Sequence, residues 1–131
     1  MSPRLLLDTH AFLWWMTADP RLAEAARDQI EDGETYVAIS AAVIWEISIK
    51  RARGKLDAPP GLEEQLGAHL ETQGFAPLPI RLEHAFRAGA LPPHHRDPFD
   101  RMLVAQAQLE GLTIVTRDRN IPRYEVPTLA A

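Results

Sequence analysis

Short apolar runs alternate with helical patterns along this 131-residue chain, and this alternation is the feature that most limits its fold. Each apolar run has a length typical of a buried strand, and each helical pattern covers two or more turns. Strands are predicted at residues 4–7, 35–39, 78–80, 113–116 and 126–129. Helices are predicted at residues 9–16, 19–32, 41–53, 62–73, 82–90 and 97–110. This order of elements predicts an α/β fold.

Length and composition fit a single domain over residues 1–131, with 46% hydrophobic residues and a net charge of −4. A chain of this size buries about 68% of its unfolded surface, so a core forms without cross-links. The chain has no cysteine, which excludes a disulfide framework, a thiol nucleophile and a cysteine zinc site. Its apolar runs are too short for a signal peptide or a membrane span. We therefore expect a cytoplasmic protein.

Acidic and hydroxyl side chains follow the predicted strands at the ends where parallel sheets bind ligands. Asp8 follows the first strand directly, Ser40 ends the second, and Asp118 lies two residues past the strand at 113–116. Glu46 lies two turns into the helix after Ser40, and Asp100 lies in the first turn of its own helix. These side chains are expected to converge on one edge of the sheet.

Each acid also has a local explanation that the sequence alone leaves open. These explanations are a helix cap for Asp8, an ion pair of Glu46 with Lys50, a helix cap for Asp97, a helix-dipole contact for Asp100 and a turn for Asp118. Together, however, several carboxylates in apolar surroundings repel one another and are costly to bury. A divalent cation would relieve both problems, and oxygen ligands favour Mg²⁺ or Mn²⁺.

Several motifs follow one another along nearly the whole chain. They are Leu7-Asp8-Thr9-His10, Ser40, Trp45-Glu46-Ile47, His95-Arg96-Asp97-Pro98-Phe99-Asp100-Arg101, Ala105-Gln106-Ala107 and Val115-Thr116-Arg117-Asp118. In this order they resemble the PIN domain, and in particular the VapC-type ribonuclease toxins of bacterial toxin–antitoxin pairs. The most specific of them is the segment from His95 to Ala107. The resemblance implies a three-layer fold in which helices flank a central parallel sheet.

The resemblance also implies an acidic Mg²⁺ site that hydrolyses RNA phosphodiester bonds, in which Mn²⁺ can substitute. Its catalytic acids would be Asp8, Glu46, Asp100 and Asp118, with Asp8 and Asp100 as the first choices for direct metal contact. Either Glu46 or Asp118 would accept a proton from the attacking water. Relatives carry a further acid after the fourth aspartate, where this chain has Arg119 and Asn120. A fifth acidic ligand is therefore not expected.

Other residues near these acids are expected to support the site. Ser40 and Thr116 would orient carboxylates or metal-bound water, and Asp97 would cap its helix and support Asp100. His94 and His95 are expected to face the substrate or pack the loop, and Trp14, Trp15 and Trp45 are expected to be structural. Cations near the acids are candidates for RNA phosphate contacts, namely Lys50, Arg51, Arg53, Arg96, Arg101 and Arg117.

The resemblance further implies a homodimer and a cognate antitoxin protein as partners. Two other functions compete with the ribonuclease. One is a PIN-like module that binds RNA or protein without cutting, against which the full set of four acids counts. The other is a phosphatase of the haloacid-dehalogenase kind, which requires a second acid two residues after the first, where this chain has His10.

Overall fold

A five-stranded parallel sheet forms the centre of the computed structural model, which describes residues 3–56 and 58–131. The strand order is β3-β2-β1-β4-β5. The predicted domain range of 1–131 also includes residues 1, 2 and 57, which lie outside the described residues. The strands are β1 (Arg4–Leu7), β2 (Tyr36–Ser40), β3 (Ala76–Leu78), β4 (Thr113–Thr116) and β5 (Thr128–Ala130).

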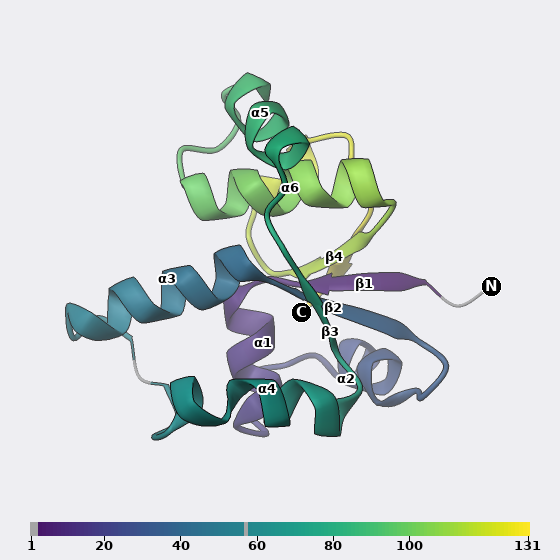
Figure 1. The fold of residues 1–131 in the computed structure, drawn as a ribbon. Helices are drawn as coiled ribbons and strands as arrows, with labels where there is room; N and C mark the ends of the chain where they lie inside the picture. The colour runs from purple at the N-terminus through teal and green to yellow at the C-terminus, as the bar shows by residue number, and fades with distance from the viewer. Residues whose placement is uncertain (1–2, 57) are drawn as a thin grey trace.

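Helices cover both faces of this sheet, so the predicted three-layer arrangement is confirmed. In Figure 1, α5 and α6 lie on one side of the sheet, and α1, α2 and α4 lie on the other. None of the helices in the described part of the chain has the length and apolar character that crossing a membrane requires. The helices are α1 (Thr9–Met16), α2 (Glu24–Glu31), α3 (Ala41–Ala52), α4 (Leu62–Gln73), α5 (Leu82–Ala90) and α6 (Pro98–Glu110), with the 3₁₀ turn η1 (Ile121–Arg123).

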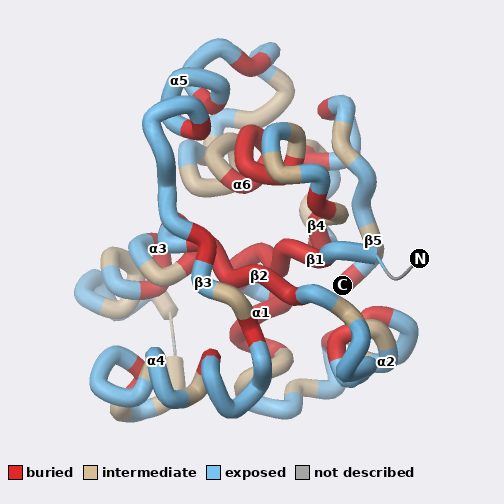
Figure 2. Tube along the Cα trace, turned by 45° about the vertical axis from the view of Figure 1, so that its right-hand side comes forward, coloured by how far each residue is buried: buried red, intermediate tan, exposed pale blue. Residues whose placement is uncertain are grey.

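Strand β1 is the middle strand, and its three leucines have no exposed surface. It pairs in parallel with β2, where Leu5 aligns with Val37, and with β4, where Leu6 aligns with Ile114. A strand covered on both faces requires a continuous apolar run, which is the pattern that predicted it. Figure 2 shows the buried residues gathered along β1, β2 and β4. The core therefore fixes the carboxyl ends of β1 and β4 side by side.

The helix predicted at residues 19–32 is wrong at its start, because α2 begins only at Glu24. The Asp19 carboxylate accepts hydrogen bonds from both the backbone N–H and the guanidinium of Arg21, the former at 2.9 Å, and so closes a turn. The strands predicted at residues 78–80 and 126–129 are each displaced by two residues, because β3 begins at Ala76 and β5 at Thr128. In β3, Pro77 lies within the strand and not beside it, which an edge strand tolerates because a ladder donor is not needed there.

A buried polar link joins the sheet to α6. The Ser40 hydroxyl donates to Gln106 Oε1 at 2.6 Å and accepts from the Ala42 backbone N–H at 3.0 Å, which caps α3. The Gln106 amide donates in turn to the Pro79 carbonyl at 3.2 Å. Both side chains have no exposed surface. Ser40 therefore fixes the position of α6 against β2.

The end of α6 provides a stability test. Gly111 follows the helix with φ +69°, a left-handed conformation that side chains disfavour, and a Cβ there would meet no atom within 4 Å. Gly111→Ala is therefore expected to destabilise the fold by about 1 kcal/mol through backbone strain alone. Gly67 lies inside α4 with equally open surroundings and no positive φ, so Gly67→Ala is expected to stabilise by about 0.5–1 kcal/mol. Urea denaturation measures the free energy of unfolding of both variants. If both substitutions change it in the same direction, the backbone strain assigned to position 111 is contradicted.

Candidate metal centre

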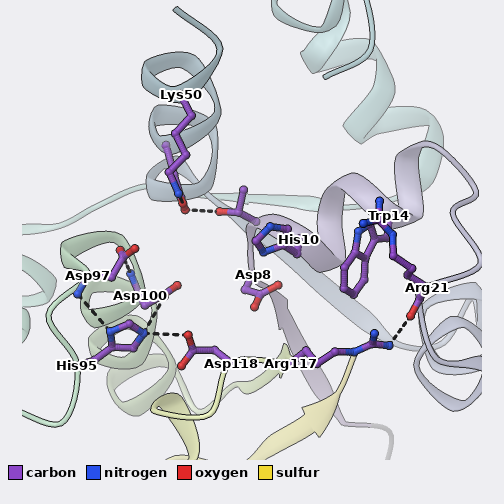
Figure 3. Close-up of a pocket in the computed structure, with 12 residues that line it drawn as sticks. Asp8, His10, Trp14, Arg21, Lys50, His95, Asp97, Asp100, Arg117 and Asp118 are labelled. Carbon is purple, nitrogen blue, oxygen red and sulfur yellow. Dashed lines mark hydrogen bonds and ion pairs between the residues drawn. The ribbon is translucent and has the colours of Figure 1, made fainter. Parts of the chain in front are cut away.

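A cleft of about 460 Å³ opens beyond the carboxyl ends of β1 and β4. The strand order changes direction here, and α/β sheets bind ligands at such a point. Figure 3 shows the side chains that line this cleft, with the Asp8 carboxyl facing its centre. The acids on its walls are Asp8, Glu46, Asp97, Asp100 and Asp118, which are the four predicted catalytic acids together with the predicted supporting acid.

Asp8 ends β1 and caps α1. Its Oδ1 accepts a hydrogen bond of 2.9 Å from the Ala11 backbone N–H, and the residue is only 6% exposed. Burial raises the pKa of the Asp8 carboxyl, although hydrogen bonds from Thr116 and Ala11 act in the opposite direction. The Thr116 hydroxyl oxygen also accepts a hydrogen bond of 3.0 Å from the Asp118 backbone N–H.

Asp100 is the acid most affected by its neighbours. Asp97 caps α6 by accepting from the backbone N–H groups of Phe99 at 2.8 Å and of Asp100 at 3.1 Å. This cap places the two carboxylates close together at the start of the helix. Burial first, and then repulsion from Asp97, Asp8 and Asp118, raise the pKa of the Asp100 carboxyl to about 8.

His95 bridges two of the acids, a contact that the sequence did not reveal. Its Nε2 lies 3.0 Å from Oδ2 of Asp100 and 3.0 Å from Oδ2 of Asp118. Its Nδ1 accepts a hydrogen bond of 3.2 Å from the Asp97 backbone N–H, so Nε2 carries the proton and donates to the acids. The imidazole thereby fixes Asp100 against Asp118.

Asp118 differs from Asp100 because most of its contacts stabilise the charged form. Burial acts to raise the pKa of its carboxyl, but hydrogen bonds from the backbone of Asn120 and Ile121 and from His95 outweigh it and lower the pKa. The Asn120 N–H lies 2.7 Å from Oδ1, and Oδ2 faces His95. A turn therefore holds one oxygen while the other faces the cleft.

Glu46 is buried on α3 and is engaged by two donors. It accepts hydrogen bonds from the Thr9 hydroxyl and from the Lys50 ammonium, so the predicted ion pair with Lys50 is confirmed. The hydrogen bond to Glu46 raises the pKa of Lys50. Lys50 also lines the cleft, which gives the acidic site one cationic wall.

The donor set fits a divalent cation. One ligand atom from each of His95, Asp100 and Asp118 lies within 4.8 Å of the others, and Asp8 faces the same space (Figure 3). Carboxylate oxygens are the ligands of hard divalent ions, and such an ion would relieve the crowding that raises the pKa of Asp100. Asp8, Asp100 and Asp118 are therefore the residues suited to hold an ion, with His95 within reach of it.

Arg101 has a different place from the one expected of an RNA-binding residue. Its guanidinium donates to backbone carbonyls on both sides of the α5–α6 connection, including those of Ala88 at 2.8 Å, Leu91 at 3.0 Å and Pro92 at 3.1 Å. It also donates to the carbonyl of His95 at 3.3 Å. Arg101 thus ties the loop that carries His95 to α6, and its donors are engaged by the chain itself.

The other predicted RNA-binding cations are divided between anchoring contacts and open surface. Arg51 pairs with Glu63 and donates to the Pro59 carbonyl at 2.7 Å, which holds the segment after α3. Arg53 and Arg96 are exposed. Arg117 lines the cleft, but its Nε donates to the Ala131 carbonyl oxygen at 3.0 Å.

The fold and this acidic cleft define a known class of protein. Residues 5–127 match the family model of the PIN domain, and the chain belongs to that family. Among curated proteins, it is 32% identical over 127 residues to Ribonuclease VapC22 of Mycobacterium tuberculosis, covering 94% of this chain and 93% of that protein. The predicted membership of the family is confirmed.

Solved structures share the fold. The VapBC2 complex of Rickettsia felis bound to a promoter DNA fragment contains a chain that matches with a TM-score of 0.69 and 16% identity, over 95% of this chain and 96% of that one. A toxin–antitoxin complex from Klebsiella pneumoniae matches with a TM-score of 0.66 and 21% identity, over 96% of both chains. FitAcB of Neisseria gonorrhoeae matches with a TM-score of 0.63 and 21% identity, also over 96% of both. These likenesses concern the fold.

The raised pKa of Asp100 makes stability depend on pH. Between its ordinary value of 3.8 and about 8, the folded state binds more protons at Asp100 than the unfolded state does. Stability without metal should therefore fall as the pH rises through this window, and Asp8 acts in the same direction. In EDTA, Asp100→Asn is expected to gain stability relative to the parent between pH 5 and pH 8, as measured by thermal denaturation.

The matched control for this experiment is Asp28→Asn, which removes an exposed carboxylate on α2. It should keep the pH dependence of the parent. A constant difference in melting temperature between Asp100→Asn and the parent across this range would contradict the crowding of charge at Asp100.

The contacts of Arg101 predict a large loss of stability on substitution. Arg101→Lys keeps the charge but not the planar set of donors, so several carbonyls lose their partner. We expect a loss of about 2 kcal/mol in urea denaturation. The matched control is Arg96→Lys, in the loop that Arg101 anchors. The exposed side chain of Arg96 makes no hydrogen bond to any described residue. Equal stability of the two variants would contradict the anchoring role.

Proposed function

We propose that this protein is a divalent-metal-dependent endoribonuclease that hydrolyses RNA phosphodiester bonds and acts in the cytoplasm as the toxin of a toxin–antitoxin pair. Mg²⁺ is the proposed ion, with Mn²⁺ as a substitute. The proposal extends to this chain the activity for which Ribonuclease VapC22 is named. It also depends on the site residues that the cleft brings together.

The observation that carries this proposal is the meeting of carboxylates from separate elements. Asp8 comes from the end of β1, Asp100 from the first turn of α6, and Asp118 from the turn after β4. Burial and mutual repulsion raise the pKa of Asp100 to about 8, a cost that a stable domain would avoid if the acids had only structural roles. Such crowding favours a metal-dependent hydrolase over a module that only binds.

Each acid is proposed to act through the oxygen that faces the cleft. Asp8, Asp100 and Asp118 would hold the ion, which would supply an activated water and stabilise charge on the phosphoryl oxygens. His95 orients Asp100 and Asp118 through its Nε2–H. Thr9 and Lys50 engage Glu46, whose negative charge holds the Lys50 ammonium at the cleft wall, where it meets a substrate phosphate.

RNA contacts outside the cleft are proposed at Arg53 and Arg96, which are exposed cations just after α3 and in the loop before α6. Phosphate contacts of this kind add affinity without sequence preference. Arg51 and Arg101 are left out of this set because the chain itself engages their donors.

The proposed partners are an antitoxin and a second copy of this chain. Antitoxin binding is inferred from the toxin–antitoxin complexes among the structural neighbours. For the homodimer we propose the exposed face of α5, where Leu82 is 89% and Phe86 is 83% exposed. Glu83 and Arg87 lie four residues apart on the same helix, so two antiparallel copies of α5 would bring each Glu83 against the other copy's Arg87.

Asp8→Asn tests the function most directly. Asparagine also caps helices, so α1 should keep its start while the site loses a ligand charge. We expect cleavage of RNA in Mg²⁺ to fall at least about 100-fold, because weakening the surroundings of a metal ligand alone costs 10–100-fold. The readout is gel analysis of RNA fragments, with calorimetry of Mn²⁺ binding beside it.

The control is Asp28→Asn, the exposed carboxylate on α2, which should cleave RNA as the parent does. Circular dichroism confirms that each variant is folded. Full activity of Asp8→Asn that EDTA still abolishes would refute the assignment of Asp8. Tight RNA binding by the parent that is independent of metal, with no cleavage, would favour the non-catalytic module, and turnover of a small phosphomonoester would favour the phosphatase.

A further inference from the structure

The cleft continues past the acids to a second end, which is lined by basic side chains. In Figure 3, His95, Asp97 and Asp100 lie on one side of Asp8, and Trp14, Arg21 and Arg117 lie on the other. This second end is formed by α1, by the connection from α1 to α2 and by the segment after β4. It holds His10, Trp14, Arg21 and Arg117, which we call the basic end of the cleft.

The basic side chains of this end pack against Trp14. Its side chain is only 9% exposed, and three other side chains lie against it. The guanidinium carbons of Arg117 and Arg21 lie 4.8 Å and 5.3 Å from its ring centroid, and the His10 ring lies 5.7 Å away. Each guanidinium gains from this cation–π contact, which also restricts its orientation. The indole thus gathers positive charge at one wall of the cleft.

Arg117 and Arg21 differ in how many of their donors remain open. Arg117 donates through Nε and Nη2 to the Ala131 carbonyl oxygen and through Nη2 to the Arg21 carbonyl oxygen, so it fixes the backbone at Arg21. The Arg21 side chain is 66% exposed and pairs with Asp19 through Nε and Nη2. Its Nη1 makes no hydrogen bond to any described residue. The backbone of Arg21 is therefore held in place, while its Nη1 remains available to a ligand.

The ion pair with Asp19 does not remove Arg21 from binding. A surface pair of this kind contributes only about 0–1 kcal/mol, whereas a guanidinium matches the geometry of a phosphate with two parallel hydrogen bonds. His10 is exposed, lies against the same Trp14 ring and adds a second donor two residues from Asp8. The basic end is thus suited to a phosphate that adjoins the acidic end.

We propose that His10 and Arg21 bind the phosphate of the nucleotide next to the scissile bond, and that Trp14 and Arg117 are positioning residues that hold Arg21 at this subsite. The proposal rests on the proposed ribonuclease function. An RNA strand carries a phosphate at every step, so a strand whose scissile phosphate lies over the acids must place a neighbouring phosphate farther along the cleft. The basic end would anchor that phosphate independently of the metal.

The test measures RNA binding separately from cleavage. Asp8→Asn serves as the background, and anisotropy of a fluorescent single-stranded RNA oligonucleotide gives its affinity in Mg²⁺ at several KCl concentrations. Adding Arg21→Gln should weaken binding about five- to tenfold. It should also reduce the slope of log K against log [KCl] by about 0.7, the value for one phosphate contact on a single strand. Adding His10→Ala, which leaves the arginines in place, should weaken binding in the same direction.

The matched control is Arg123→Gln, because Arg123 is an exposed arginine of η1 that does not line this cleft. It changes the net charge equally and should leave affinity and slope unchanged. An unchanged affinity in Arg21→Gln, or an equal loss in Arg123→Gln, would overturn the subsite. If the parent protein cleaves no RNA, the proposed ribonuclease function fails, whereas the anisotropy result still decides whether Arg21 contacts the strand.

Discussion

Repulsion among carboxylates at the carboxyl ends of β1 and β4 is the constraint on which the rest of this structure depends. The sheet brings Asp8 and Asp118 to the same edge, and α6 adds Asp100. Burial removes water that would screen these charges, and the pKa of Asp100 rises to about 8 as a result. The imidazole of His95 and the ammonium of Lys50 offset part of this cost. A divalent cation held by Asp8, Asp100 and Asp118 would offset the remainder.

The local roles of the acids are compatible with their proposed functional roles. Asp8 caps α1, Asp97 caps α6, and Asp118 closes a turn. In the best-defined case, Oδ1 of Asp118 accepts from the backbone while Oδ2 faces His95. A carboxylate has two oxygens, so one contact to the backbone fixes its direction and leaves the other oxygen for the cleft. The caps therefore orient the site.

The sequence predicts the layers, most element boundaries and the acids of the cleft, because buried strands and helix periodicity are local signals. It fails where the deciding partner is distant or is a backbone atom. Asp19 followed by proline is typical of a helix start, yet its carboxylate is taken by Arg21. Arg101 lies in an acidic motif, so the sequence suggests that it contacts an RNA phosphate. Its acceptors are instead backbone carbonyl oxygens, which a pattern of side chains cannot reveal. His95 precedes α6 and Asp118 follows β4, so the two meet only through the tertiary fold.

The attachment of the α5–α6 connection also determines how this loop can change during evolution. Arg101 donates hydrogen bonds to main-chain oxygens of this loop, and the Tyr124 hydroxyl donates to the Pro92 carbonyl at 2.8 Å. Main-chain acceptors are the same for every amino acid, so the loop side chains can diverge while the backbone path to His95 is retained. The surface beside the cleft can thus acquire new recognition properties, by natural drift or by grafting, without rebuilding the chemistry beneath it.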